Sequence, residues 1–221
     1  MDQQNSMKLV VAGAGFGDII NLIEAIKEKT PQLDFIGFVD DKPELEGALI
    51  FGYPVIGKFD WLKSERVHIF NSVAKTMAIR AAATKKLSAC GSDFASLVHP
   101  TVNTRYSSIG VDVAIFENVF LGPNTSVGSH TIVHSGCMIG HDVSIGENCF
   151  IAPGAQILGG VKIGDNVAIG ANSVCLPKSL IGDGATVGAA SLVSGIVATG
   201  ATMLGVPARK FFGSAILRKK E

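Results

Sequence analysis

The sequence has no excess of either charge and no hydrophobic run long enough to cross a membrane. Lys plus Arg and Asp plus Glu both number 19 in 221 residues. Proteins that bind nucleic acid through its phosphates carry an excess of Lys and Arg. No stretch reaches the ~18 consecutive apolar residues of a membrane span, and the opening MDQQNS lacks the cationic start of a signal peptide. These absences predict a cytoplasmic protein that binds neither nucleic acid nor a membrane.

The sequence also lacks paired cysteines. Its four cysteines, Cys90, Cys137, Cys149 and Cys175, form no C-x-x-C pair and have no histidine at zinc-finger spacing. This arrangement favours reduced, buried thiols over disulfides or a metal site. We therefore expect no metal ligands among the cysteines.

Glycine, in contrast, is abundant, and the chain has enough apolar residues to fold. Hydrophobic residues make up 47% of the sequence, which excludes a disordered chain. The 26 glycines are about 12% of the chain against the usual ~7%, and most of them follow residue 109. The two halves are therefore predicted to have different architectures.

A six-residue period runs through the second half. From Ile109 to Val193, every sixth residue is aliphatic or cysteine, at fifteen positions without a break. A run of this length has a chance of about one in ten thousand at this composition. Glycine directly follows nine of the fifteen, and small or β-branched residues recur four positions on. This hexapeptide repeat predicts a parallel β-helix, a triangular prism with three short strands per coil and the aliphatic residues inside.

Three cysteines fall on inward positions of this repeat. Cys137 and Cys149 occupy the small position and Cys175 the aliphatic one, so we expect all three to fill the core. No residue is inserted among the fifteen repeats, so the prism has flat faces and no loop that could form a pocket. A catalytic cleft would then lie between subunits, and flat, partly apolar faces favour cyclic association.

The first half alternates between apolar runs and helical patterns. An apolar run at 7–12 leads into a turn with Gly13, Gly15 and Gly17, and a helical pattern follows from Asp18 to Ile26. A second apolar run at 35–39 ends in Asp40 and Asp41. Further on, we predict a strand at 67–70, a helix at 73–87 and a last strand at 94–98. The predicted domains are a Rossmann-like α/β domain over residues 1–98 and a β-helix with a short tail over 99–221.

The glycine turn is compatible with three roles. It could be only a tight connection from strand to helix. It could hold a pyrophosphate on helix N-terminal amides while Asp40 or Asp41 binds a ribose hydroxyl, as in dinucleotide enzymes. The domain has only about half the strands of a full dinucleotide fold. A mononucleotide or nucleotide sugar therefore fits it better.

Three of the five histidines lie on two successive coils of the predicted β-helix. His141 is followed directly by Asp142, at the corner after Ile139 and Gly140. A carboxylate beside an imidazole orients it and stabilises its protonated form, so the pair suits a general base with its partner. The alternative is an exposed corner histidine without a role. We expect His68 and His99, in the first domain, to be structural.

Several segments together resemble one known family. They are the glycine turn, Gly37–Asp41, Leu97–Pro100, Gly140–Gly146, Ile151–Ala155, Gly159–Gly164 and Gly205–Arg209. They are similar to the PglD/NeuD-like nucleotide-sugar acetyltransferases of bacterial glycan assembly, a branch of the hexapeptide acyltransferases. This resemblance implies a left-handed β-helix, a homotrimer and acetyl-CoA as co-substrate without a metal.

The resemblance also implies a role for individual residues. His141 would be the general base with Asp142 as its partner, and the acyl group would pass directly to the sugar. The nucleotide sugar would bind at Gly13, Gly15, Gly17, Asp40 and Asp41. Coenzyme A would lie between two prisms; its predicted contacts are Gly159, Gly170, Gly205, Val206, Pro207, Ala208, His134 and Phe150.

The sequence departs from the family at three positions. The family usually carries G-G-H or S-G-H in the first glycine turn, where this chain has Gly15-Phe16-Gly17-Asp18 and no histidine. Some members have a second histidine where this chain has Phe150, and many have asparagine where it has His134.

The predicted function is an acetyl-CoA-dependent N-acetyltransferase that acts on a nucleotide-linked 4-amino-4,6-dideoxy sugar. Three alternatives remain open. A sialic acid O-acetyltransferase would use the same base and groove. A trimer like the gamma-type carbonic anhydrases would bind zinc through His130, His134 and His141, although these leave the prism in different directions. The third alternative is a non-catalytic hexapeptide scaffold.

Overall fold

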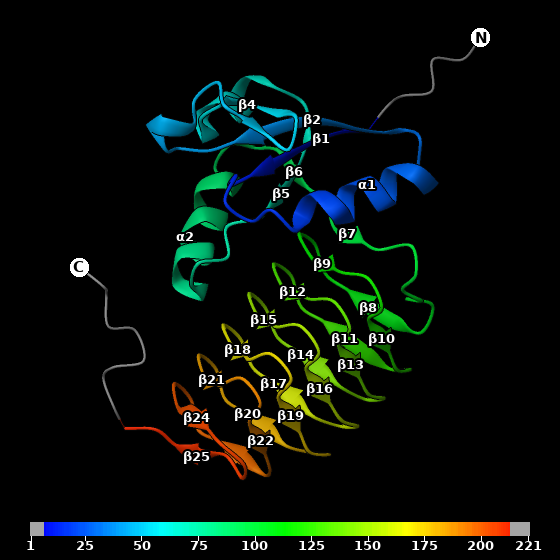
Figure 1. Cartoon of the computed structure of the whole chain (residues 1–221), viewed down its shortest axis with the longest axis vertical. Coiled ribbons are helices and arrows are strands. Elements are labelled where there is room, and N and C mark those ends of the chain that lie inside the picture. Colours follow the sequence, from blue (N-terminus) through cyan, green and yellow to red (C-terminus); the bar gives the residue numbers. More distant parts are fainter. Residues whose placement is uncertain (1–6, 213–221) are drawn as a thin grey trace.

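The computed structural model describes residues 7–212, which form an α/β domain stacked on one end of a β-helix (Figure 1). For the tail at 210–221 the sequence is compatible with a terminal helix or a solvated segment, and most of this tail lies outside the described residues. Within them, Arg209–Lys210 form a short strand instead. None of the described helices is long and apolar enough to span a membrane.

The α/β domain contains one six-stranded sheet in the order β3-β4-β2-β1-β5-β6. Its elements are β1 (Met7–Ala12), α1 (Ile19–Lys29), β2 (Leu33–Val39), β3 (Leu49–Ile50), β4 (Tyr53–Gly57), β5 (His68–Asn71), α2 (Met77–Ser88) and β6 (Asp93–Phe94), with 3-10 turns at Pro43–Leu45 and Phe59–Ser64. All neighbouring strands are parallel except β3 and β4. The continuous apolar run of β1 is explained by its central place, where both faces of the strand are covered.

Two predictions for this domain need correction. The second helix begins at Met77, not at residue 73, because the Thr76 side chain accepts a hydrogen bond from the Ile79 N–H (3.2 Å) and caps the helix there. The predicted strand at 94–98 is two strands in different sheets, since β6 pairs with β5 while β7 (Leu97–Val98) pairs with β9. Ser96 turns the chain between them by bonding Gly110 and Val113 of the β-helix.

The β-helix has three flat faces, which the chain visits in a fixed order (Figure 1). Face 1 contains β7, β9 (Ala114–Ile115), β12 (Ile132–Val133), β15 (Phe150–Ile151), β18 (Ala168–Ile169), β21 (Thr186–Val187), β24 (Thr202–Leu204) and β25 (Arg209–Lys210). Face 2 contains β10 (Phe120–Leu121), β13 (Met138–Ile139), β16 (Gln156–Ile157), β19 (Val174–Cys175) and β22 (Leu192–Val193). Face 3 contains β8 (Ser107–Ile109), β11 (Thr125–Val127), β14 (Ser144–Ile145), β17 (Lys162–Ile163), β20 (Leu180–Ile181) and β23 (Ile196–Val197).

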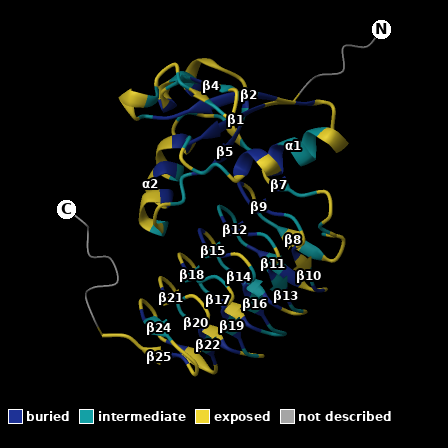
Figure 2. Cartoon of the chain, in the orientation of Figure 1, coloured by how far each residue is buried: buried dark blue, intermediate teal, exposed yellow. Residues whose placement is uncertain are grey.

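The aliphatic residues of the repeat form the core of the prism, and buried positions recur along its coils (Figure 2). Ile139 pairs with Ile157, and Ile157 pairs with Cys175, so each coil takes 18 residues. The three cysteines predicted to be core residues are free and buried. Burial raises the pKa of the Cys149 and Cys175 thiols to about 12, which keeps them protonated and unreactive.

Two backbone features allow the coils to stack closely. Every sixth residue from Asp112 to Ala190 has a positive φ, and most of these corner residues are Asn, Asp or Gly. The glycine that follows an aliphatic residue serves a different purpose. A Cβ at Gly122 would lie 2.5 Å from the backbone nitrogen of His141 on the next coil. These glycines therefore allow successive coils to approach closely at the corner.

The α/β domain packs on the start of face 1. Ala114, Phe116 and Ile132 of the β-helix share one buried cluster with α1 and the sheet. A fully buried ion pair also joins the two parts, since Nη2 of Arg80 on α2 lies 3.4 Å from Oδ2 of Asp112. The domain therefore has a fixed place on the prism.

Neighbouring residues of β17 test whether the aliphatic residues of the repeat point into the prism. Ile163 is buried and Lys162 is exposed. We expect Ile163→Ala to lower the free energy of unfolding by about 2–5 kcal/mol, because it leaves a cavity between two coils. Lys162→Ala should change it by less than about 0.5 kcal/mol. Chemical denaturation measures both, and equal effects of the two substitutions would contradict the inward orientation of Ile163.

Candidate functional site

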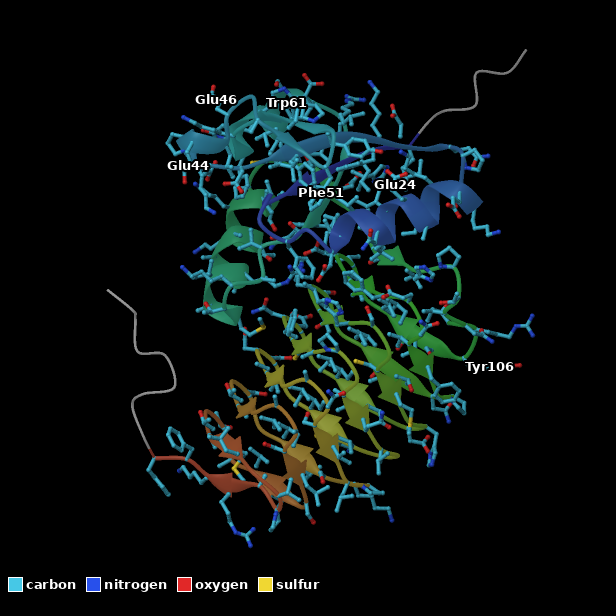
Figure 3. The ribbon with its side chains drawn as sticks, in the orientation of Figure 1. Glu24, Glu44, Glu46, Phe51, Trp61 and Tyr106 are labelled. Carbon is cyan, nitrogen blue, oxygen red and sulfur yellow. The ribbon has the colours of Figure 1, made fainter. Side chains whose placement is uncertain are left out.

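His141 and Asp142 form a solvent-exposed hydrogen-bonded pair at the corner between faces 2 and 3. His141 Nδ1 lies 2.7 Å from Asp142 Oδ2, and the side chains are 68% and 56% exposed. The other carboxylate oxygen of Asp142 accepts a hydrogen bond from Asn124 Nδ2 (3.2 Å), one coil earlier. Tyr106, labelled in Figure 3, projects from the same corner, one further coil toward the α/β domain. The predicted pairing of His141 with Asp142 is therefore present in the structure.

The electrostatics of this pair favour one tautomer of the imidazole. The hydrogen bonds from His141 and then from Asn124 hold the pKa of the Asp142 carboxyl below its usual value. An ionised carboxylate only accepts hydrogen bonds, so the proton between the two groups belongs to Nδ1. In the neutral ring, Nε2 then carries a free lone pair that can accept a proton.

Gly159 lies one coil beyond His141 and leaves room for the imidazole. A Cβ at position 159 would come within 2.6 Å of His141 Nε2, so any larger residue would push the ring aside. The backbone N–H of Gly160 donates to the His141 carbonyl (2.9 Å) and fixes this corner. Of the predicted coenzyme contacts, Gly159 is the one that the structure brings next to His141.

The predicted coenzyme contacts at Gly170 and in the 205–208 segment lie at the opposite edge of face 2. Gly170 follows β18, and the 205–208 segment follows β24, both at the corner between faces 1 and 2. This segment is held by hydrogen bonds to Ser191 and Leu192, while the Val206 side chain is 70% exposed. Within one chain, these residues and His141 are on different edges of the prism.

The α/β domain has a cleft of 690 Å³ at the carboxyl ends of its parallel strands. It lies where the strand order reverses, between the turn after β1 and the loop after β5, which is the usual ligand position in such sheets. Gly13 and Gly15, predicted to contact the nucleotide, line it together with Asp40 and Asp41. Gly13 needs its glycine, because it has φ +94 and a Cβ there would lie 2.8 Å from Val73 Cγ2.

Gly17 is the predicted nucleotide contact that does not line this cleft. A Cβ at Gly17 would meet the ring of Phe51 at 3.1 Å, so the residue lies beneath that side chain. Phe51 itself is 68% exposed and is labelled in Figure 3. Gly17 thus helps to build the turn that precedes α1.

The two aspartates hold the loops around the cleft. The oxygens of Asp40 accept hydrogen bonds from the backbone N–H groups of Ala14 (2.9 Å) and Lys42 (3.0 Å). Asp41 accepts one from the Phe59 N–H (3.0 Å) and pairs with Lys86 Nζ at 2.5 Å. Burial alone would raise the pKa of Asp41, but these two hydrogen bonds and the charges of Lys86 and Lys58 lower it overall. Both carboxylates therefore already bind protein groups.

Three lysines at the cleft were missed in the sequence. Lys42 follows β2, Lys75 precedes α2, and Lys86 lies on α2, and all three line the cleft. They come from separate elements and show no common spacing. The positions of Lys42 and Lys75 just after strands of a parallel sheet were the available signal.

Within one chain, His134 and Phe150, both predicted to contact the coenzyme, lie on face 1 and not at the His141 corner. The His134 ring stacks on Phe116 with centroids 4.5 Å apart, and its Nε2 lies 3.3 Å from Asp18 Oδ2. Phe150 projects from face 1 and lines the cleft of the α/β domain. Both residues belong to the junction between the two domains, because face 1 is the face on which the α/β domain packs.

The three histidines considered as zinc ligands point to different partners. His130 Nδ1 lies 2.9 Å from the buried Asp112, His134 lies in the aromatic cluster, and His141 faces solvent. Among residues 7–212, no three His, Cys, Asp or Glu side chains come close enough to hold a metal ion together.

Comparison with known proteins supports the repeat and the fold. The family model for the bacterial transferase hexapeptide (six repeats) matches residues 142–177. No curated protein matches the sequence.

Solved structures match nearly the whole chain. The acetyltransferase domain of PglB from Neisseria gonorrhoeae, in complex with acetyl coenzyme A, is 26% identical with a TM-score of 0.82, over 93% of this chain and 100% of that domain. WeeI from Acinetobacter baumannii is 25% identical with a TM-score of 0.81, over 93% and 100%. A variant of perosamine N-acetyltransferase from Caulobacter crescentus, with CoA and GDP-perosamine, is 22% identical with a TM-score of 0.84, over 93% and 97%. These matches confirm the resemblance to hexapeptide acetyltransferases and the predicted fold class, an α/β domain followed by a β-helix.

The tautomer of His141 can be tested by removing its partner carboxylate. Asp142 has φ +57, a conformation that glycine adopts without strain, so Asp142→Gly deletes the carboxylate and keeps the corner. We expect the Nε2-protonated tautomer of His141 to gain population, because Nδ1–H loses its acceptor. Long-range proton–nitrogen NMR measures this, with Asn118→Gly at an equivalent corner (φ +59) as the control. An unchanged His141 spectrum in Asp142→Gly would contradict the assignment.

Proposed function

We propose that this chain is an acetyl-CoA-dependent N-acetyltransferase that acylates the amino group of a nucleotide-linked 4-amino-4,6-dideoxy sugar. The observation that carries the proposal is the exposed His141–Asp142 pair, whose Nε2 lies over Gly159. The similar PglB domain is an acetyltransferase bound to acetyl coenzyme A. The fold shared with a perosamine N-acetyltransferase adds a nucleotide-linked amino sugar as a precedent.

The chemistry of the pair suits direct acyl transfer. The neutral sugar amine attacks the thioester carbonyl, and His141 Nε2 takes a proton from the nitrogen as the new amide bond forms. The carbon–sulfur bond breaks, and the leaving thiolate receives the proton and departs as free coenzyme A. Asp142 keeps Nδ1 protonated and stabilises the imidazolium between the two proton transfers. No covalent acyl-enzyme is needed.

The cleft of the α/β domain suits the nucleotide part of the substrate. Lys42, Lys75 and Lys86 offer cationic groups for a diphosphate, and the turns that precede α1 and α2 both border the cleft. Phe16, Phe59 and Phe150 provide apolar walls against which a base can pack. Gly15 is the open part of the turn, since a Cβ there would meet nothing within 4 Å.

The positions of the cleft and of His141 within one chain support catalysis between two copies. The α/β domain packs on face 1, whereas His141 lies at the corner between faces 2 and 3, across the prism. A sugar bound in the cleft of one chain would then reach the base of another chain.

Face 2, which ends at the His141 corner, is suited to self-association. Phe120 is 59% exposed, and the other outward residues of face 2, Met138, Gln156, Val174 and Leu192, are mostly apolar. We propose a homotrimer with coenzyme A between two prisms, near Gly159 of one copy and near Gly170 and Gly205–Ala208 of its neighbour.

The activity is tested by thiol release from acetyl-CoA with a panel of acceptors. The panel contains UDP-, dTDP- and GDP-linked 4-amino sugars together with free and CMP-linked sialic acid. Release with one amino sugar supports the proposal. Release with sialic acid alone would replace it with an O-acetyltransferase. No release and no coenzyme A binding would favour a scaffold without catalysis.

Substitution of His141 tests its proposed role as the general base. We expect His141→Ala to lower kcat by about 10²- to 10⁴-fold, the usual contribution of a positioned general base. Coenzyme A affinity should change little, because the imidazole acts on the acceptor. His68→Ala, in the α/β sheet, is the matched control. A His141→Ala enzyme with full kcat would exclude His141 as the base.

Catalysis between copies can be tested with two inactive variants. One carries His141→Ala, and the other carries Lys75→Glu with Lys86→Glu in the cleft. Random co-assembly of the two in trimers should restore about a quarter of the wild-type activity, because a quarter of the sites combine an intact cleft with an intact histidine. A mixture that stays inactive, although mass measurement shows mixed trimers, would place the whole site within one chain.

A further inference from the structure

Arg80 is the only arginine on α2, and its side chain is fully buried between the two domains. Its Nε donates to the His130 carbonyl (2.8 Å), and its Nη2 lies 3.4 Å from Asp112 Oδ2. Asp112 also binds His130 Nδ1 (2.9 Å). Asp112 and His130 lie on successive coils at the corner between faces 3 and 1. The guanidinium is thus anchored in a corner of the β-helix.

The same guanidinium binds the loop that follows β5. Its Nη1 donates to the carbonyls of Asn71 and Val73, the latter at 3.3 Å. Asn71 is fixed from both sides, because its N–H donates to Asp112 Oδ1 (2.7 Å) and its Oδ1 accepts from the Val73 N–H (3.0 Å). Its side-chain amide also donates to Thr84 Oγ1 (2.9 Å) on α2. One planar group therefore ties this loop to the β-helix.

This loop forms a wall of the proposed nucleotide cleft. Ser72, Val73, Ala74 and Lys75 all line it, and Val73 packs against the glycine turn at Gly13. On α2, Ile79, Ala82, Ala83 and Lys86 line the cleft as well. Arg80 itself is not among the lining residues, so it can affect a bound ligand only through the wall that it holds.

Stability alone is a poor explanation for this buried pair. Desolvation lowers the pKa of Arg80 although Asp112 is adjacent, and it raises the pKa of Asp112 despite His130 and Arg80. In both groups the cost of burial outweighs the attraction. An apolar contact already joins the domains through Ala114, Phe116 and Ile132. Apolar residues often replace such pairs without loss of stability, whereas a guanidinium fixes several carbonyls in one plane.

We propose that Arg80 is a positioning residue for the nucleotide cleft, which sets the 72–75 wall from the corner of the β-helix. The nature of the ligand rests on the proposed function, whereas the effect on the wall does not.

The test compares wild type with Arg80→Lys, which keeps the charge but loses the planar set of donors. Titration calorimetry measures the affinities for UDP, GDP, dTDP and coenzyme A, and amide hydrogen exchange follows residues 72–76. We expect nucleoside diphosphate binding to weaken about tenfold, because binding must then also order the 72–75 wall, at a cost of about one hydrogen bond to a charged group. Exchange at 72–76 should become faster, and coenzyme A affinity should stay the same. Arg66→Lys, the same change at an exposed position, is the control.

Arg80→Lys with a lower melting temperature but unchanged diphosphate affinity and unchanged exchange at 72–76 would overturn the proposal, because it shows a purely structural role. If Arg80→Lys does not fold, Thr84→Val removes one bond to Asn71 and leaves the ion pair intact. It should cause a smaller change in the same direction, and no change would overturn the proposal. If wild type binds no diphosphate, the nucleotide part of the proposed function fails, and the exchange measurement alone decides the role of Arg80.

Discussion

Backbone pairing between residues 18 positions apart is the constraint on which this structure depends. It stacks the aliphatic residues into one core, and it also builds the polar pairs that matter for function. Asn124 supports Asp142, Gly159 makes room for His141, and Asp112 binds His130, and each of these pairs is separated by one coil. A one-residue insertion in any of these coils would separate the partners, because the side-chain pattern would move to another part of the corner.

The two domains have different tasks that follow from their backbones. A prism with flat faces presents side chains at its corners but cannot enclose a ligand, so its histidine remains exposed. The parallel sheet forms a cleft between the loops of β1 and β5, where the direction of the strand order reverses. Since the α/β domain packs on the start of face 1, the cleft and the base are on opposite sides of one chain. This separation is why the proposed reaction needs a second copy.

Several polar groups around the cleft and the domain junction bind protein partners. Asp40 and Asp41 fix loops, His134 packs against Phe116, and Arg80 binds backbone carbonyls. The lysines that line the cleft are the cationic groups proposed to bind the diphosphate, and Lys86 would exchange its pairing with Asp41 for it. The cleft is therefore shaped by two aspartates and an arginine that bind protein groups, whereas its proposed affinity for phosphate comes from lysines.

Sequence periodicity by itself determined the β-helix, its five coils of inward residues and the His141–Asp142 pair, because each depends on spacing along the chain. The first strand, the glycine turn and the first helix were also predictable, since their apolar patterns are local. The tertiary structure alone decided the rest. The split of residues 94–98 between two sheets, the cleft lysines and the burial of Arg80 against Asp112 depend on which distant segments meet. The same holds for His134 and Phe150, whose position on face 1 follows from where the α/β domain packs. Periodicity specifies which way a side chain points from its own coil, but not what covers it.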